Sequence, residues 1–325
     1  MLRCERYHLD SGRIDVLTPE QVPECLLHPE TVLWVDIEAP TEDELHWVAE
    51  TFAFHPLAME DVRNQQQRAK LDPYDGYNFF VMRTLHYHPR SHRLDSEQLD
   101  IFLGASYLVT IHRSPLPAIA QARHRWEQSH LPHEAAFYLF YVVADVVVDS
   151  FFPIIDEMGD LIDDLDAQIF AQPKRELLQT LFALRRSLLT VRKNLTPLRD
   201  ALNELIRSAE GGTIIPMEHT RAYINDVYDH ILRQTDFVDT YRDMLSGSLD
   251  AYQSSLSNKL NENMQRLTVA ATILATGTVV TGFYGMNLRG IGINSEWLFG
   301  GHLVLAILLV VTLIELWLFR RKGWI

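Results

Sequence analysis

The stretch LTVAATILATGTVVTGFYGMNL, from Leu267 to Leu288, decides the fold of this chain, because its 22 residues carry no formal charge. As a helix rising about 1.5 Å per residue it measures roughly 33 Å, which is enough to cross the hydrocarbon core of a membrane. A second apolar run, Trp297–Ile314, follows after a short connection. These are the two membrane-length runs that the sequence indicates, and they predict a tight hairpin of two transmembrane helices.

Charged residues around the hairpin predict its orientation. The connecting loop holds Arg289 as its only basic residue, whereas the other side of the two runs holds Lys259, Arg266, Arg320, Arg321 and Lys322. Because basic residues collect on the cytoplasmic side, we expect both termini in the cytoplasm of a multi-pass protein of the inner or plasma membrane. The predicted segments are a first transmembrane helix over 264–287, an extracytoplasmic loop over 288–297, a second transmembrane helix over 298–319 and a basic cytoplasmic tail over 320–325.

Composition predicts a mostly water-soluble body attached to this small anchor. The net charge is −14, carried almost entirely before residue 261. Such acidity argues against nucleic acid as a partner and suits a surface that handles cations. The N-terminal residues do not read as a signal peptide, and Cys4 and Cys25 are too few for a disulfide framework. Both observations fit a reducing cytoplasm.

The prolines divide the soluble part from a helical remainder. All 14 lie between Pro19 and Pro216, so the front of the chain is expected to be interrupted repeatedly. Strand-like composition at 32–37, 77–82 and 107–111, with a capping-box pattern at 41–44, predicts a mixed α/β domain over 1–130. An acidic segment followed by a basic, leucine-rich segment predicts an antiparallel helical hairpin over 131–216.

The remaining soluble residues predict one very long helix. No proline interrupts the chain from Glu218 to Gly285, which allows a helix of roughly 100 Å with a stalk over 217–263. A helix of this length needs packing partners, and two transmembrane helices cannot enclose an aqueous path. We therefore expect an oligomer with one long helix per subunit around its axis.

The tripeptide Gly285-Met286-Asn287 resembles the signature of the CorA family of divalent-cation channels. The resemblance covers nearly the whole chain, including Trp34-Val35-Asp36, the stretch 55–62, the stretch 226–230 and the basic end. It implies a funnel-shaped homopentamer in a lipid bilayer, with a cytoplasmic α/β domain, a stalk helix that continues into the pore helix and a second helix facing lipid. It also implies transport of Mg²⁺ and Co²⁺, with Ni²⁺ or Zn²⁺ as further candidates, and no enzymatic activity.

The tripeptide suits recognition of a hydrated ion. Mg²⁺ dehydrates reluctantly, so a ring of uncharged Asn287 amides at the pore mouth, with backbone oxygens near Gly285, could accept hydrogen bonds from its waters. The alternative is that Gly285 and Asn287 only cap the helix. Steps of three and four residues predict a pore-lining stripe of Asn261, Met264, Leu267, Ala271, Ala275, Thr278 and Gly282. Its apolar end at Met264 and Leu267 suits gating by dewetting, whereas ordinary helix packing is the alternative for the small residues.

Other residues are candidate metal ligands. The family match assigns Asp226 to an inter-subunit site that senses cytoplasmic Mg²⁺, with a solvated helix face as the alternative. His88 stands where some relatives carry an acid, and neutral imidazole is a poor ligand for Mg²⁺. His86, His88 and His92 could instead hold Zn²⁺ or Co²⁺. Glu315, inside the second predicted transmembrane helix, is either functional, or it snorkels or pairs with the basic end of the chain.

Three hypotheses for the function remain at this point. The first is a Mg²⁺ and Co²⁺ channel gated by cytoplasmic Mg²⁺. The second is a transporter of Zn²⁺ or another transition metal, similar to the ZntB branch, although Met286 favours the magnesium branch. The third is a membrane-anchored metal sensor or enzyme, for which no catalytic motif is found. Influx, efflux and proton coupling are all compatible with the sequence.

Overall fold

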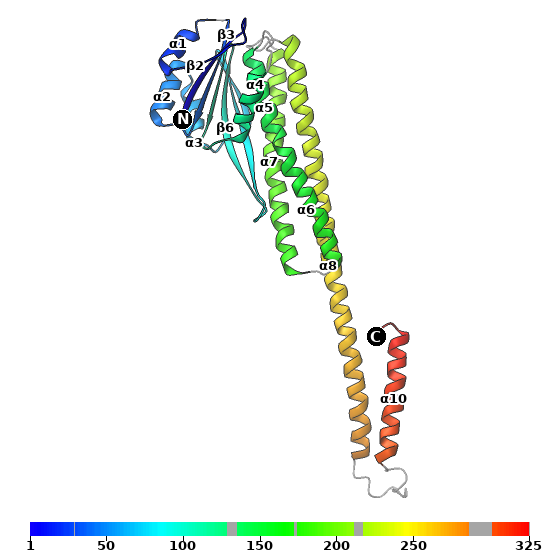
Figure 1. The fold of residues 1–325 in the computed structure, drawn as a ribbon. Coiled ribbons are helices and arrows are strands. Elements are labelled where there is room, and N and C mark those ends of the chain that lie inside the picture. Colours follow the sequence, from blue (N-terminus) through cyan, green and yellow to red (C-terminus); the bar gives the residue numbers. More distant parts are fainter. Residues whose placement is uncertain (29, 129–134, 172–173, 211–216, 286–300, 325) are drawn as a thin grey trace. The chain divides into compact units, whose positions relative to one another are not determined.

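The computed structural model describes residues 1–28, 30–128, 135–171, 174–210, 217–285 and 301–324 (Figure 1). The chain divides into two compact units. The first contains Met1–Ala167 and Lys174–Ser248, and the second contains Gln168–Pro173 and Leu249–Ile325.

Seven strands of the described chain form one mixed sheet in the first unit, in the order β2-β1-β3-β7-β6-β5-β4. They are β1 Leu2–His8, β2 Ile14–Leu17, β3 Thr31–Glu38, β4 Lys70–Tyr74, β5 Tyr77–His88, β6 Arg93–Gly104 and β7 Tyr107–His112. β3 and β7 pair in parallel, and the other neighbours pair antiparallel. The three segments predicted as strands lie in β3, β5 and β7, so the predicted mixed sheet is confirmed.

Helices cover both faces of this sheet. One face carries η1 Pro19–Gln21, α1 Val22–Cys25, α2 Glu42–Thr51 and α3 Pro56–Asn64 over a core that includes Phe79 and Phe102. α2 begins with the predicted capping box, in which Thr41 Oγ1 accepts from the Glu44 N–H at 3.2 Å and Glu44 Oε2 accepts from the Thr41 N–H at 2.8 Å. The other face carries α4 Pro117–Glu127 and α5 Ala135–Asp149, where Phe140 contacts Phe80 with ring centroids 5.3 Å apart.

The segment predicted as a helical hairpin contains α6 Phe151–Ala171 and α7 Arg175–Glu210, which run in opposite directions (Figure 1). α7 packs against β4, β5 and β6. Pro197 lies inside α7 without ending it, as the predicted helical hairpin required. Packing against the sheet compensates for the one helical hydrogen bond that this proline removes.

Two further helices follow, α8 Met217–Gly285 with 69 residues and α10 Gly301–Arg321 with 21. The predicted very long helix is confirmed. Its first turns belong to the first unit, where Gln234 Nε2 donates to the Val148 carbonyl of α5 at 2.7 Å. α10 begins within the second predicted apolar run, and the predicted loop over 288–297 lies outside the described residues.

Two stretches of the described helices are long and apolar enough to cross a membrane, Ala136–Ile169 and Arg221–Phe283. The sequence did not single out the first of them. In that stretch 67% of the most apolar window is buried inside the fold, as in the core helices of soluble proteins, whereas in the second stretch the buried share is 0%. The apolar surface of α8 is therefore left uncovered within one chain.

Candidate functional site

The predicted pore-lining stripe lies on the C-terminal part of α8, in the second unit. Each of its seven residues is exposed in the single chain: Asn261, Met264, Leu267, Ala271, Ala275, Thr278 and Gly282. The two large apolar side chains are exposed by 61% at Met264 and 65% at Leu267. Exposure does not single out this stripe, because Leu274, Val279 and Phe283 of the same helix are exposed as well.

Threonine hydroxyls on the same helix bond to the helix backbone. Thr268, Thr272 and Thr278 each donate to the carbonyl four residues earlier at 2.8 Å. A hydroxyl that donates within its own helix is satisfied in apolar surroundings. Thr278 therefore presents an oxygen that still accepts a hydrogen bond, on the stripe itself.

The predicted selectivity filter begins at the end of this helix. Gly285 is the last residue of α8. Met286 and Asn287 lie outside the described residues, so their role in the filter stays a prediction.

Glu315 of α10 is bonded to α8. Thr276 Oγ1 donates to Glu315 Oε1 at 2.5 Å, while Glu315 Oε2 is buried without a hydrogen-bond partner among the described residues. Among the described residues Glu315 makes no ion pair with the basic end of the chain, which was one of the predicted alternatives. Arg321 instead lies over the Trp317 ring, 5.5 Å from its centroid.

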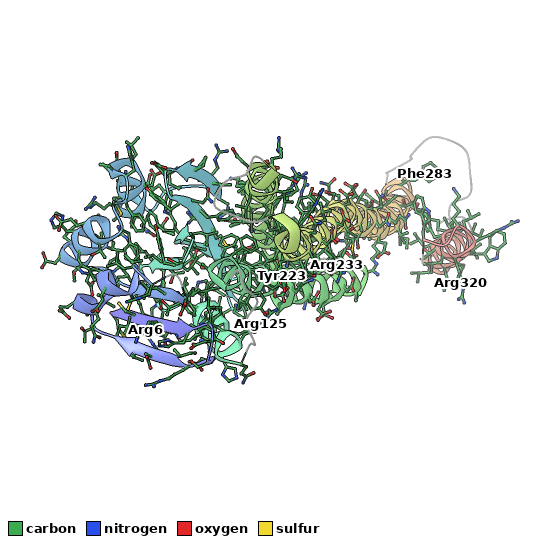
Figure 2. All side chains as sticks on the ribbon, turned by 90° about the horizontal axis from the view of Figure 1, so that it is seen from above. Arg6, Arg125, Tyr223, Arg233, Phe283 and Arg320 are labelled. Carbon is green, nitrogen blue, oxygen red and sulfur yellow. The ribbon has the colours of Figure 1, made fainter. Side chains whose placement is uncertain are left out.

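Asp226 lies on the first part of α8, against α5. Tyr141 of α5 donates its hydroxyl to Asp226 Oδ2 at 3.0 Å. Burial, followed by nearby carboxylates, raises the pKa of Tyr141, so this hydroxyl stays a donor. Tyr141 also contacts the Tyr223 ring at 4.7 Å and the Arg125 guanidinium at 5.7 Å, and Figure 2 labels both of these residues. Asp226 is itself exposed, so within one chain it lies at the surface with one carboxylate oxygen held by the buried Tyr141.

His88 lies at the end of β5 and is paired with another element. Its Nε2 is 2.9 Å from Asp95 Oδ2 of β6, and the side chain is 45% exposed. Within one chain, no contact among the described residues joins His88 to Asp226. The expected site lies between subunits, so it stays a prediction.

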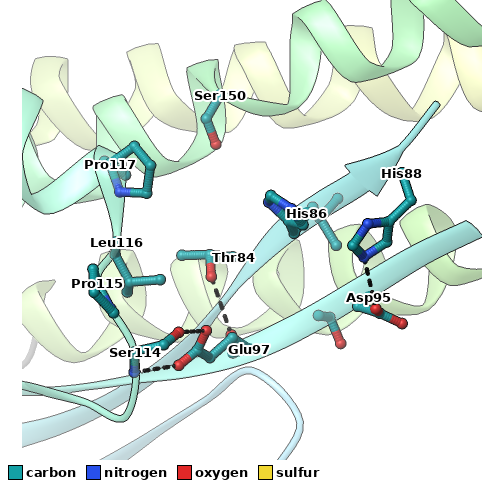
Figure 3. Close-up of a pocket in the computed structure, with 13 residues that line it drawn as sticks. Thr84, His86, His88, Asp95, Glu97, Ser114, Pro115, Leu116, Pro117 and Ser150 are labelled. Atoms are coloured by element: carbon teal, nitrogen blue, oxygen red, sulfur yellow. Dashed lines mark hydrogen bonds and ion pairs between the residues drawn. The ribbon is translucent and has the colours of Figure 1, made fainter. Parts of the chain in front are cut away.

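The predicted histidine trio is not assembled. His86 and His88 share one side of β5, with ring centroids 4.8 Å apart, and line a pocket of about 620 Å³ beside Asp95 (Figure 3). His92 has a left-handed backbone with φ of 52°, and its Nδ1 lies 3.0 Å from the hydroxyl of Tyr87. Because neighbouring residues of a strand point to opposite faces, Tyr87 holds His92 away from the other two histidines.

The structure brings together three ligand-type residues that the sequence interpretation did not group. Asp145 and Asp149 of α5 face His230 of α8, and one ligand atom of each lies within 4.8 Å of the others. Burial, only partly offset by Arg125, raises the pKa of Asp145. In the sequence, two aspartates four residues apart within the apolar run 142–149 could have indicated this group.

Comparison with known proteins agrees with this arrangement of a mixed sheet, a very long helix and a short final helix. A model of the family described as CorA-like Mg²⁺ transporter protein matches residues 29–321. The Thermotoga maritima cobalt/magnesium transport protein CorA is 34% identical, over 91% of this chain and 84% of its own length. A Methanocaldococcus jannaschii protein of the same name is 24% identical, over 90% of this chain and 92% of its own length.

Solved structures show the same fold. The complete structure of the CorA magnesium transporter from M. jannaschii has a TM-score of 0.83 at 22% identity and covers 100% of this chain and 99% of its own. The cytoplasmic domain of ZntB from Vibrio parahaemolyticus has a TM-score of 0.61 at 13% identity and covers 79% of this chain and 99% of its own.

The family match and the fold define a membrane transport protein with one very long helix. The chain belongs to the CorA family, as the match over 29–321 and the 34% identity show. This confirms the resemblance noted in the sequence. Members of this family are transporters or channels, so the expectation that the chain is not an enzyme is confirmed as well.

Proposed function

We propose that this chain is one subunit of a homopentameric channel that passes divalent cations, with Mg²⁺ as the main cargo and Co²⁺ as the second. The observation that supports this most is that α8 is apolar enough to cross a membrane and that 0% of its most apolar window is buried within the chain, with the predicted stripe from Asn261 to Gly282 along it. Around a fivefold axis, five such stripes would line one path. The curated relatives named above are cobalt/magnesium transport proteins.

The proposed topology places both termini in the cytoplasm of a cell with the channel in its inner or plasma membrane. The α/β domain over 1–130, the helical segment over 131–216 and the stalk over 217–263 are the cytoplasmic parts. The segments 264–287 and 298–319 cross the lipid bilayer. The basic residues on one side of the hairpin support this orientation.

The proposed filter is a ring of Gly285, Met286 and Asn287 at the extracytoplasmic mouth. An uncharged amide bonds to the waters of the hydrated ion and releases it again, whereas a ring of carboxylates would hold it longer. The oxygen of Thr278 continues the row of acceptors inward along the helix.

The proposed gate and sensor lie on the cytoplasmic side. Met264 and Leu267 would close the path as a dry constriction. Bound cytoplasmic Mg²⁺ would hold neighbouring subunits together in the closed state through Asp226, with His88 as a weaker contributor.

Ion flux through the purified full-length protein in sealed liposomes tests the proposal. We expect entry of Mg²⁺ and Co²⁺ down their gradients without a proton gradient, with Ni²⁺ and Zn²⁺ measured alongside. Zn²⁺ flux without Mg²⁺ flux would instead support a ZntB-type transporter. No flux of any divalent cation would overturn the proposal.

Asn287→Ala is the matched variant for this assay. Removing the amide is expected to abolish selective Mg²⁺ flux and to leave the assembled oligomer intact, as checked by cross-linking and size-exclusion chromatography. Unchanged selective flux in Asn287→Ala would mean that the filter lies elsewhere.

A further inference from the structure

A pocket rich in basic residues lies between α7 and the sheet, within the first unit. Its volume is about 810 Å³, which is within the range of roughly 300–1,000 Å³ found for ligand pockets. Its lining residues come from α7, from β5 and β6, and from the segment between α3 and β4. Elements that are far apart in the sequence therefore build this pocket together.

The charge of this pocket is opposite to that of the chain. Arg68, Arg83, Arg192 and Lys193 line it, and no Asp or Glu is among the described residues that do so. The chain as a whole carries a net charge of −14, and the pocket lined by the two histidines of β5 contains acids as well. A group of cations without lining acids, in an acidic protein, favours an anionic ligand.

Arg83 of β5 is held in place without an acid partner. Its Nε donates to Ser96 Oγ at 3.1 Å, while Nη1 and Nη2 donate to the carbonyls of Gln67 and Ser96 at 3.0 and 2.8 Å. Burial, only partly offset by Asp100 and Glu97, lowers the pKa of Arg83. These bonds use three of the five N–H donors of the guanidinium, so donors remain for an anion that would also stabilise its charge.

The other three cations are exposed. Arg68 and Lys193 make no ion pair among the described residues. Arg192 Nε lies 3.4 Å from Oδ1 of Asp239 on α8, and the same oxygen accepts from Arg242 at 2.8 Å. Because the side chains of Arg192 and Asp239 are 44% and 41% exposed, water screens their attraction. All three cations are therefore able to turn to an anion next to Arg83.

We propose that this pocket binds a soluble anion with two or more phosphate groups, from a nucleoside di- or triphosphate or an inorganic polyphosphate. Guanidinium groups match phosphate oxygens through paired hydrogen bonds, and several cations offset several negative charges. The pocket is larger than one inorganic phosphate needs, and Leu189 and Pro197 give it an apolar surface for a nucleoside. It contains no residue of the proposed filter, stripe or sensor, so the inference does not depend on the proposed transport function.

An anion in this pocket would also act on the long helix. It would compete with Asp239 of α8 for the guanidinium of Arg192, whose ion pair joins α7 to α8. By reciprocity, loss of that ion pair should strengthen binding of the anion. Asp239→Asn is therefore expected to bind the anion up to about fivefold more tightly, which is the range for an exposed ion pair.

Equilibrium dialysis of radiolabelled ATP with the detergent-solubilised full-length protein tests the proposal. Divalent cations are removed beforehand on a chelating resin, because they would otherwise bridge the nucleotide to the acids of the chain. We expect one ATP per chain, displaced by tripolyphosphate and not by adenosine. Tripolyphosphate that competes as strongly as ATP would identify the phosphate groups as the whole ligand, whereas weaker competition would assign the nucleoside a part in binding.

Exposed residues provide variants that separate this pocket from the general charge of the surface. Arg68→Gln and Lys193→Gln are each expected to weaken ATP binding about tenfold, as for loss of one charge-assisted hydrogen bond. Arg185→Gln is the matched control, because it removes the same charge from an exposed position of α7 outside the pocket lining. It should bind ATP as wild type does.

The outcomes decide the proposal directly. Absence of ATP binding would overturn it, as would adenosine competing as well as tripolyphosphate. Unchanged binding in both Arg68→Gln and Lys193→Gln would overturn it too, and so would an equal loss in Arg185→Gln. Unchanged affinity in Asp239→Asn would overturn the link to α8. Retained ATP binding without ion flux in liposomes would count against the transport proposal and leave this site standing.

Discussion

Asp100 of β6 is a carboxylate enclosed in the sheet, with 0% exposure. Gln98 and Gln65 donate to its two oxygens at 2.7 and 3.0 Å. Burial outweighs these bonds and raises the pKa of Asp100 to about 7 from the ordinary 3.8. The native state therefore keeps a proton that the unfolded chain releases, and the stability contributed by this group falls as the pH rises from about 4 to about 7.

Asp100→Asn removes this pH dependence. A neutral amide needs no proton, although the glutamine that turns to accept from it gives up its own bond to Val62 or Gln67, so the variant should be more stable than wild type at pH 8 by the order of 2 kcal/mol. Thermal unfolding of both proteins at pH 5 and pH 8 measures this difference in stability. Asp95→Asn, on the exposed part of the same strand, is the control. An unchanged difference between the two pH values in Asp100→Asn would show that Asp100 is already ionised in the fold.

The bond between Thr276 and Glu315 gives a second prediction at this scale. It joins α8 to α10 in surroundings where a lone carboxylate is costly, so the two residues should be energetically coupled. A double-mutant cycle of Thr276→Val and Glu315→Leu, followed by unfolding in detergent, should give a coupling of about 1 kcal/mol. Thr272→Val with Glu315→Leu is the matched control, since Thr272 bonds to its own helix. Additive effects in the first pair would exclude the bond as a contributor to stability.

The proposed pore-lining stripe gives a prediction about helix α8 as a whole. If Met264 and Leu267 form the dry constriction of the proposed channel, Leu267→Ser should admit water and raise the basal Mg²⁺ flux at high cytoplasmic Mg²⁺. The liposome assay with Mg²⁺ inside and outside measures this basal flux. Leu274→Ser is the comparison, because Leu274 is exposed on the same helix outside the stripe. Flux that stays fully inhibited in Leu267→Ser would place the gate elsewhere.

Elements with a strong local pattern could be predicted from the sequence. The uninterrupted run that ends at Gly285 predicted α8, and the capping box at Thr41 predicted the start of α2. β1, β2, β4 and β6 were not predicted, because they are set by pairing with distant strands and not by local composition.

Sites formed between elements were the hardest to predict. The stripe on α8 rests on helical periodicity alone and stays a prediction. The group of Asp145, Asp149 and His230 required knowledge of how α5 packs on α8. The candidate group of His86, His88 and His92 is not assembled, because the closeness of His92 to His88 in sequence does not fix which face of the hairpin His92 occupies.

At the scale of the whole molecule, two features of α8 concern the assembly of subunits. One is its uncovered apolar surface, and the other is the row of acids along its stalk. An apolar helix surface with a buried share of 0% favours association with lipid and with further subunits. The acids that recur along α8, among them Asp226, Asp229, Asp236, Asp239 and Asp243, would repel one another in a ring of subunits unless cations lie between them. Association and cation binding are therefore expected to be linked.

Protease protection of the assembled protein tests that linkage. In the proposed pentamer a ligand that binds the closed ring more tightly must stabilise it, so Mg²⁺ should slow proteolysis of wild-type protein. Asp226→Lys places a cation where the metal would bind and also removes the acceptor of the Tyr141 hydroxyl. It should give partial protection without Mg²⁺ and a smaller further gain with Mg²⁺, because the remaining acids of the stalk share the binding. Asp250→Lys, an exposed acid further along α8, should respond to Mg²⁺ as wild type does. Equal Mg²⁺ protection in wild type and Asp226→Lys would remove Asp226 from the sensor, and absence of protection in wild type would remove Mg²⁺ sensing by the ring altogether.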